Sequence, residues 1–120
     1  MRRVALLTPY VDSVNEMIDA YFAGQGLDII ERGSFKQTFA TINRISEDDV
    51  ARAAIELGSR DVDALFISCT GLRCSGVIET VERAIGKPVV ASNQALAWHS
   101  LQLAGIDQPI VGRGLLLASC

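Results

Sequence analysis

Short apolar runs alternate with amphipathic stretches along the whole chain, and this alternation constrains the fold more than any other feature. The apolar runs are nearly continuous, which is typical of strands covered on both faces, and the stretches between them have apolar residues at helical spacing. Strands are expected at 3–10, 27–35, 62–68 and 88–92, with 114–119 as a candidate fifth, and helices at 13–23, 47–57, 75–85 and 93–105.

Serine and glycine residues mark the expected helix ends. Ser13 with Glu16, and Ser46 with Asp49, have the spacing of capping boxes, in which a serine side chain accepts from a backbone N–H of the first turn. Gly86 follows the third helical pattern, and glycine commonly ends a helix in the left-handed conformation. We therefore expect helices to begin at these two serines and the third helix to stop at Gly86.

This order of elements predicts an α/β fold, a three-layer, doubly wound (flavodoxin-like) parallel sheet of four strands or, with 114–119, five. The 120 residues fit one domain, 1–120. In open α/β sheets, ligands bind beyond the carboxyl ends of the strands. The residues at the carboxyl ends of the expected strands are 8–10, 33–35, 69–71 and 92–93, and we expect the functional site there.

Composition and charge exclude several classes of partner. Fourteen acidic residues outnumber eleven basic ones and the bases form no stripe, so nucleic-acid binding is not expected. No apolar stretch approaches the ~20 residues that span a bilayer, and Pro9, Tyr10 and Asp12 interrupt the opening run that resembles a secretion signal. Three cysteines, an odd number, indicate a reducing compartment, and we expect a cytoplasmic protein.

Cys69 follows the most apolar strand and precedes a glycine-containing turn. At the start of a helix, a thiol meets unpaired N–H groups and the positive end of the helix dipole, which both favour the thiolate. The N–H groups of Thr70, Gly71 and Leu72 are candidates for an anion cradle, and Arg73 adds positive charge. The alternative is a buried and inert Cys69, and position alone leaves both interpretations open.

Three segments resemble a known family when they are taken together. "TPY" after the first strand, "FISCTGLR" at the third and "GKPVVASNQALAWHSL" at the fourth strand and helix are similar to the carboxy-terminal half of the aspartate/glutamate racemase superfamily. The most similar members are the maleate cis–trans isomerases, the arylmalonate decarboxylases and the related ectoine-utilisation protein. The resemblance covers nearly the whole chain.

The resemblance implies a cofactor-independent enzyme that acts on a small carboxylate or dicarboxylate. Family members have two similar α/β domains that face each other, each with a cysteine or its substitute at a strand end. Cys69 matches the cysteine of the second half, Thr70 and Gly71 match its oxyanion-binding turn, and Tyr10 matches a carboxylate-binding tyrosine. Asn93 either binds the substrate carboxylate or caps the fourth helix.

The sequence departs from the family pattern in two places. The chain begins directly before the strand that opens the second half, so we expect a homo-oligomer or a missing first domain. Thr38 and Phe39 stand where some isomerases have an amide ligand. The expected function is a maleate isomerase-like isomerase or racemase. The alternatives are an arylmalonate decarboxylase-like lyase, a catalytically incomplete half-domain or carboxylate-binding module, and, more distantly, a flavin domain.

The other candidate reactive residues have simpler explanations. His99 is the single histidine and no CxxC spacing occurs, so no metal site is expected. No G-x-G-x-x-G follows the first strand, so no nucleotide cofactor is expected. Cys74 is interpreted as a buried residue rather than a resolving thiol, His99 as a packing or surface residue, and Cys120 as a frayed terminal residue.

Overall fold

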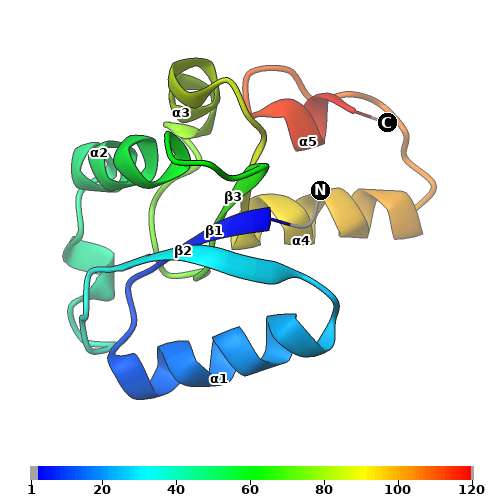
Figure 1. Ribbon diagram of the computed structural model, residues 1–120. Helices are drawn as coiled ribbons and strands as arrows, with labels where there is room; N and C mark the ends of the chain where they lie inside the picture. The colour runs from blue at the N-terminus through cyan, green and yellow to red at the C-terminus, as the bar shows by residue number, and fades with distance from the viewer. Residues whose placement is uncertain (1–2, 120) are drawn as a thin grey trace.

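The computed structural model describes residues 3–119 and has one four-stranded sheet (Figure 1). The strands are β1 (Arg3–Thr8), β2 (Asp28–Ser34), β3 (Ala64–Ile67) and β4 (Val89–Ala91). They lie in the order β2-β1-β3-β4, and every neighbouring pair is parallel. The predicted α/β fold with a parallel sheet is therefore confirmed.

Helices connect the strands and cover the sheet. They are α1 (Asp12–Gly24), α2 (Glu47–Gly58), α3 (Ile78–Ile85), α4 (Ser92–Leu103) and α5 (Leu115–Ala118), with a short 3-10 helix η1 (Ile42–Arg44). Figure 1 shows α1 on one side of the sheet and α2 and α3 on the other. No helix within residues 3–119 is long and apolar enough to span a bilayer.

The predicted helix ends are partly confirmed. Ser46 Oγ accepts the Asp49 N–H at 3.1 Å, and Gly86 ends α3 in the left-handed conformation at φ 68°. The expected cap at Ser13 is wrong, because α1 begins one residue earlier and Val11 is its N-cap. Asp12 in the first turn instead places a negative charge at the positive end of the helix dipole.

The candidate fifth strand is wrong, because residues 115–118 form helix α5. The Glu82 carboxylate accepts the Leu115 N–H, with Oε2 at 3.0 Å, and this bond ties the segment to α3. Gly114 has a φ of 97°, and a Cβ there would lie 2.6 Å from both Gln94 Nε2 and Ile78 Cγ2. At Gly114, the positive φ and the close neighbouring side chains interrupt the extended conformation, and the chain forms a helical turn instead of a strand.

The apolar core lies between the sheet and the α2–α3 layer. It includes Leu7, Leu65 and Ile67 from the strands, which are at most 2% exposed. Helix α1 has no buried residue on the opposite side. Its predicted apolar stripe is only partly covered, because Met17 is 72% exposed and Tyr21 is 64% exposed. The α1 side of the sheet is therefore the less closely packed side.

Candidate active site

The carboxyl ends of the strands meet at one edge of the sheet, as predicted. The Phe35 N–H donates to the Thr8 carbonyl at 3.0 Å, which joins the ends of β2 and β1. The Ser68 N–H donates to the Leu7 carbonyl at 3.0 Å, which joins the ends of β3 and β1. Each of the four strands is followed by a segment that begins at this edge, and these segments carry the candidate residues.

Cys69 is a free, half-buried thiol with a strained backbone. Its φ of 154° lies in the region that favours glycine, and such strain persists only where neighbouring groups hold it. One holding contact is Ser92 Oγ, which accepts the Cys69 N–H at 3.1 Å. The cysteine is therefore fixed by the first residue of α4.

The expectation that Cys69 lies at a helix start is wrong, because α3 begins only at Ile78 and residues 70–77 are turns and loop. Gly76 lies close to Glu47, where a Cβ would be 2.6 Å from Oε2, and the chain turns there before the helix begins. The dipole of α3 consequently does not act on this thiol as the sequence suggested. A single amide contacts the sulfur instead, because the Gly71 N–H donates to Cys69 Sγ at 3.3 Å.

Asn93 holds the same turn from α4. Its Nδ2 donates to the Thr70 carbonyl at 2.9 Å. The capping alternative is wrong, since Ala91 is the N-cap and Asn93 lies inside the first helical turn. Thr70, Gly71 and Asn93 are exposed, so the turn is open to a ligand.

Tyr10 is directed at the thiol. Burial, a side-chain hydrogen bond with Cys69 and the charge interaction with Cys69 together raise the pKa of Tyr10 to about 12, against a hydrogen bond with Ser68 that lowers it. The phenol is therefore protonated at neutral pH and serves as a hydrogen-bond donor. The structure brings Tyr10, Cys69 and Gly71 together.

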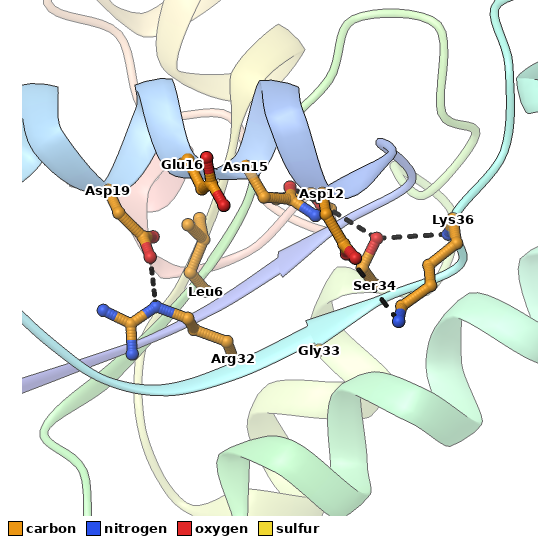
Figure 2. Close-up of a pocket in the computed structure, with 10 residues that line it drawn as sticks. Leu6, Asp12, Asn15, Glu16, Asp19, Arg32, Gly33, Ser34 and Lys36 are labelled. Atoms are coloured by element: carbon orange, nitrogen blue, oxygen red, sulfur yellow. Dashed lines mark hydrogen bonds and ion pairs between the residues drawn. The ribbon is translucent and has the colours of Figure 1, made fainter.

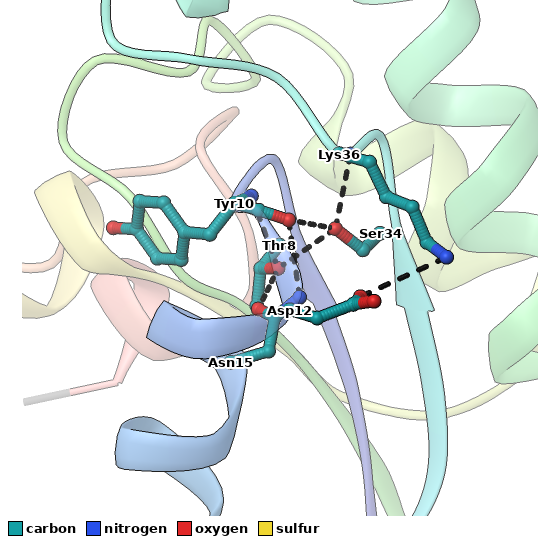
Figure 3. A network of polar contacts seen from close by, with 6 residues as sticks. All are labelled: Thr8, Tyr10, Asp12, Asn15, Ser34 and Lys36. Atoms are coloured by element: carbon teal, nitrogen blue, oxygen red, sulfur yellow. Dashed lines mark hydrogen bonds and ion pairs between the residues drawn. The ribbon is translucent and has the colours of Figure 1, made fainter.

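The main chain of Tyr10 is held by a polar network (Figure 3). The Tyr10 N–H donates to Thr8 Oγ1 at 3.3 Å, and Asn15 Nδ2 donates to the Tyr10 carbonyl at 3.1 Å. Ser34 Oγ donates to the same carbonyl. Figure 3 shows the aromatic ring directed away from this network.

An apolar cavity of about 150 Å³ adjoins Tyr10 on the side of the loop after β2. A methyl group on Gly71 would lie 3.6 Å from Ile42 Cγ2 and 3.7 Å from Cys69 Sγ, which places Ile42 near the thiol. Sequence reasoning missed Ile42 and the role of Ser92, although apolar residues in a loop were a usable signal. The cavity is lined by Tyr10, Val11, Val14, Gln37, Thr38, Phe39 and Ile42.

A larger cavity of about 340 Å³ lies between α1 and β2, away from Cys69 (Figure 2). Its charged groups pair with one another, since Arg32 Nε contacts the Asp19 carboxylate and Lys36 Nζ lies 3.7 Å from Asp12 Oδ1. Neither Cys69 nor Tyr10 lines it. This cavity is therefore separate from the candidate active site.

The remaining candidates lie outside the site. Cys74 is a free, buried thiol, and burial together with the charge interactions of Glu47 and Cys69 raises its pKa to about 11. The buried interpretation of Cys74 is confirmed. His99 is exposed on α4, and Cys120 lies outside the described residues. Within residues 3–119, no group of three or more His, Cys, Asp or Glu side chains is arranged to hold a metal ion.

Comparisons with known proteins agree over almost the whole chain. The arylmalonate decarboxylase family model matches residues 1–117. The arylmalonate decarboxylase of Bordetella bronchiseptica is 35% identical over 111 residues, which cover 88% of this chain and 45% of the relative. The maleate isomerase of Nocardia farcinica is 33% identical over 118 residues, which cover 97% of this chain and 47% of the relative.

Solved structures show the same similarity. A cysteine-to-serine mutant of the Nocardia farcinica maleate cis-trans isomerase, with a covalently bound succinylcysteine intermediate, superposes with a TM-score of 0.91 at 30% identity. The superposition covers 98% of this chain and 49% of that one. The chain therefore spans about half the length of the curated relatives it matches.

Proposed function

Because the chain belongs to the arylmalonate decarboxylase family, we propose that it forms the Cys69 half of a cofactor-independent isomerase for small dicarboxylates. The observation that carries this proposal is the pair of donors at one sulfur. Gly71 donates its N–H to Cys69 Sγ, and the protonated Tyr10 hydroxyl interacts with the same side chain. Hydrogen-bond donors on sulfur favour the thiolate, which is the nucleophilic form of cysteine.

The proposed reaction is the cis–trans isomerisation of a maleate-like alkene. The Cys69 thiolate forms an S–C bond with one alkene carbon, and the electron pair of the double bond moves onto the neighbouring carbon and its carboxylate. Rotation about the new single bond follows. The electron pair then returns, the S–C bond breaks and the thiolate is released. The succinylcysteine intermediate in a cysteine-to-serine mutant of a relative lies on a cysteine that the mutant retains, and it supports thiol addition as a step open to this family.

Tyr10 and the turn residues bind the carboxylate groups in this proposal. The Tyr10 hydroxyl is a donor beside the sulfur, and the amides of Thr70 and Gly71 lie on the exposed turn. Asn93 acts indirectly, since its amide holds the Thr70 carbonyl. Donors placed where negative charge develops stabilise the transition state.

A second candidate function is decarboxylation of a malonate that carries an apolar group. The apolar cavity beside Tyr10, with Phe39 and Ile42 in its lining, favours this candidate. Such a substrate would lose carbon dioxide as its C–C bond breaks, and the electrons would remain on the α-carbon. The Cys69 thiol would then donate a proton to that carbon.

A second α/β unit would complete the site in either case. The relatives are about twice as long as this chain, and the donors described here all come from this single α/β unit. A second copy of the chain or a preceding domain would supply the other side, and the exposed Met17 and Tyr21 provide apolar surface for association. The two free thiols, Cys69 and Cys74, support the prediction of a reducing, cytoplasmic location.

Incubation with maleate and with phenylmalonate tests both functions, with fumarate followed by proton NMR and carbon dioxide by a coupled assay. Turnover of maleate that Cys69→Ser abolishes and Cys74→Ala retains would support the isomerase. Carbon dioxide from phenylmalonate with the same dependence would support the decarboxylase. Sedimentation of the same samples shows whether a second copy is present.

Alkylation of Cys69 by iodoacetamide identifies the non-catalytic alternative. Protection by maleate without turnover would mean a carboxylate-binding module or an incomplete half. Absence of both protection and turnover, in the monomer and in any oligomer, would overturn the proposed function.

A further inference from the structure

We propose that Asn15 is a positioning residue that holds Tyr10 against Cys69 through the main chain of Tyr10. The inference rests on the proposed function of Cys69 and extends it to a residue that does not contact the thiol. Asn15 lies on α1, whereas Cys69 follows β3. The connection between them runs through Tyr10 and the end of β1 (Figure 3).

Asn15 uses both ends of its amide. Oδ1 accepts from the hydroxyl of Thr8, which is only 2% exposed, and Nδ2 donates to the Tyr10 carbonyl at 3.1 Å. Thr8 Oγ1 in turn accepts the Tyr10 N–H at 3.3 Å. One asparagine therefore fixes the main chain of Tyr10 at its carbonyl and, through Thr8, at its N–H.

Ser34 completes the arrangement from β2. Its hydroxyl donates to the Tyr10 carbonyl, so this oxygen accepts one bond from α1 and one from β2. A carbonyl oxygen has two lone pairs, and both are used here. Ser34 Oγ also accepts the Lys36 N–H at 3.1 Å. Tyr10 is thus held by side chains of both α1 and β2.

The position of Asn15 on α1 excludes helix capping and core packing as its role. Val11 is the N-cap residue and Asn15 lies within the helix, so Asn15 is not the N-cap. No residue of α1 is buried, so Asn15 is not part of the core either. Its amide points at the segment that presents the tyrosine. Because a shift of ~1 Å in a reacting group can cost about 100-fold in rate, this position matters for the thiol.

A double-mutant cycle on Cys69 alkylation tests the inference without any substrate. The chain is treated with iodoacetamide at neutral pH, and the tryptic peptide of Cys69, which ends at Arg73, is quantified separately from that of Cys74. Tyr10→Phe should slow alkylation about threefold to tenfold, the value of one hydrogen bond. Asn15→Leu should slow it as much, and the double variant should be no slower than either single variant.

Two further variants separate positioning from folding. Asn15→Asp keeps the acceptor for Thr8 but loses the donor to the Tyr10 carbonyl, so it should slow alkylation as Asn15→Leu does. Asn43→Leu makes the same chemical change at an exposed asparagine of η1 and should leave the rate unchanged. Circular dichroism confirms that each variant is folded.

The ultraviolet titration of Tyr10 gives an independent readout. In a Tyr21→Phe background, Tyr10 is the only tyrosine of the chain. Loss of its contact with Cys69 should lower its pKa from about 12, so Asn15→Leu should show more tyrosinate at a pH of about 10.5.

Three results would overturn the inference: an unchanged alkylation rate in Tyr10→Phe, an unchanged rate in both Asn15 variants, or additive effects in the double variant. The proposed function fails differently, through absent turnover and absent maleate protection in the unsubstituted chain. A chain without turnover that still shows the non-additive cycle would support the role of Asn15 alone.

Discussion

Ser92 Oγ accepts a hydrogen bond from the Cys69 N–H at 3.1 Å, so the first residue of α4 holds the backbone of the strained cysteine. The neighbouring Asn93 donates from Nδ2 to the Thr70 carbonyl at 2.9 Å. The end of β3 and the start of α4 are therefore locked together by two side chains. The site depends on this contact between segments 23 residues apart in sequence.

Replacement of Ser92 by alanine should lower both stability and the reactivity of Cys69. The Cys69 N–H would lose its acceptor, which costs about 1–2 kcal/mol when the group is kept from water. Urea denaturation measures the loss, and alkylation measures the reactivity. Ser100→Ala on the same helix is the control, because Ser100 Oγ donates only to the Leu96 carbonyl. Equal effects of the two substitutions would contradict the prediction.

Glycine at position 69 should be more stable than alanine at the same position. The φ of 154° strains any residue with a Cβ, and removal of this strain should favour Cys69→Gly over Cys69→Ala by about 1 kcal/mol. The order should reverse at the buried Cys74, where no such φ occurs. Urea denaturation of the four variants measures the order of stability at each position. A higher stability of the alanine variant at both positions would disprove the strain.

Stability should fall as the pH rises from about 9 to 11, partly because of Cys74. Burial raises its pKa from 9.0 to about 11, so the unfolded chain loses this proton at a lower pH than the folded chain does. The contribution of Cys74 is therefore fully present below pH 9 and is lost as the pH passes 11. Cys74→Ala should flatten this part of the stability curve. Parallel curves for the two proteins between pH 8 and 11 would contradict the assignment.

Substitution of Gly114 by alanine should loosen the C-terminal helix α5. A methyl group there would lie 2.6 Å from Gln94 Nε2 and Ile78 Cγ2, and φ is also positive at 97°. Gly105→Ala is the matched control, since its φ is 72° but nothing lies within 4 Å of a Cβ. The difference in unfolding free energy between the two variants should be about 1–3 kcal/mol. Proteolysis after Arg113 should also be faster in Gly114→Ala than in the control.

Local patterns predicted the sheet and most helices correctly, because the apolar runs and the Ser46 cap act over a few residues. The same patterns predicted the strand-end edge that carries Tyr10 and Cys69. They also suggested a strand at 114–119, where apolar residues are continuous. The outcome there was decided by Glu82 and Gly114, whose contacts join distant parts of the chain.

For the candidate site, too, the sequence predicted local features but not the contacts between distant segments. The residue types were evident in the sequence, but the groups that contact the Cys69 sulfur were not. A helix dipole was expected, yet the Gly71 N–H and the Tyr10 hydroxyl are the groups that reach the sulfur. Ser92, Asn15 and Ile42 act through folded geometry, and their spacing in the sequence carries no sign of it.

Helix α1 has no buried residue, so its opening should cost less free energy than the opening of the buried strands. Its amides should therefore exchange with deuterium well before those of β1 and β3. Each opening would withdraw the Asn15 amide and release Tyr10 while the core stays folded. Any surface that covers Met17 and Tyr21 would suppress these openings and so increase the reactivity of a thiol it never touches.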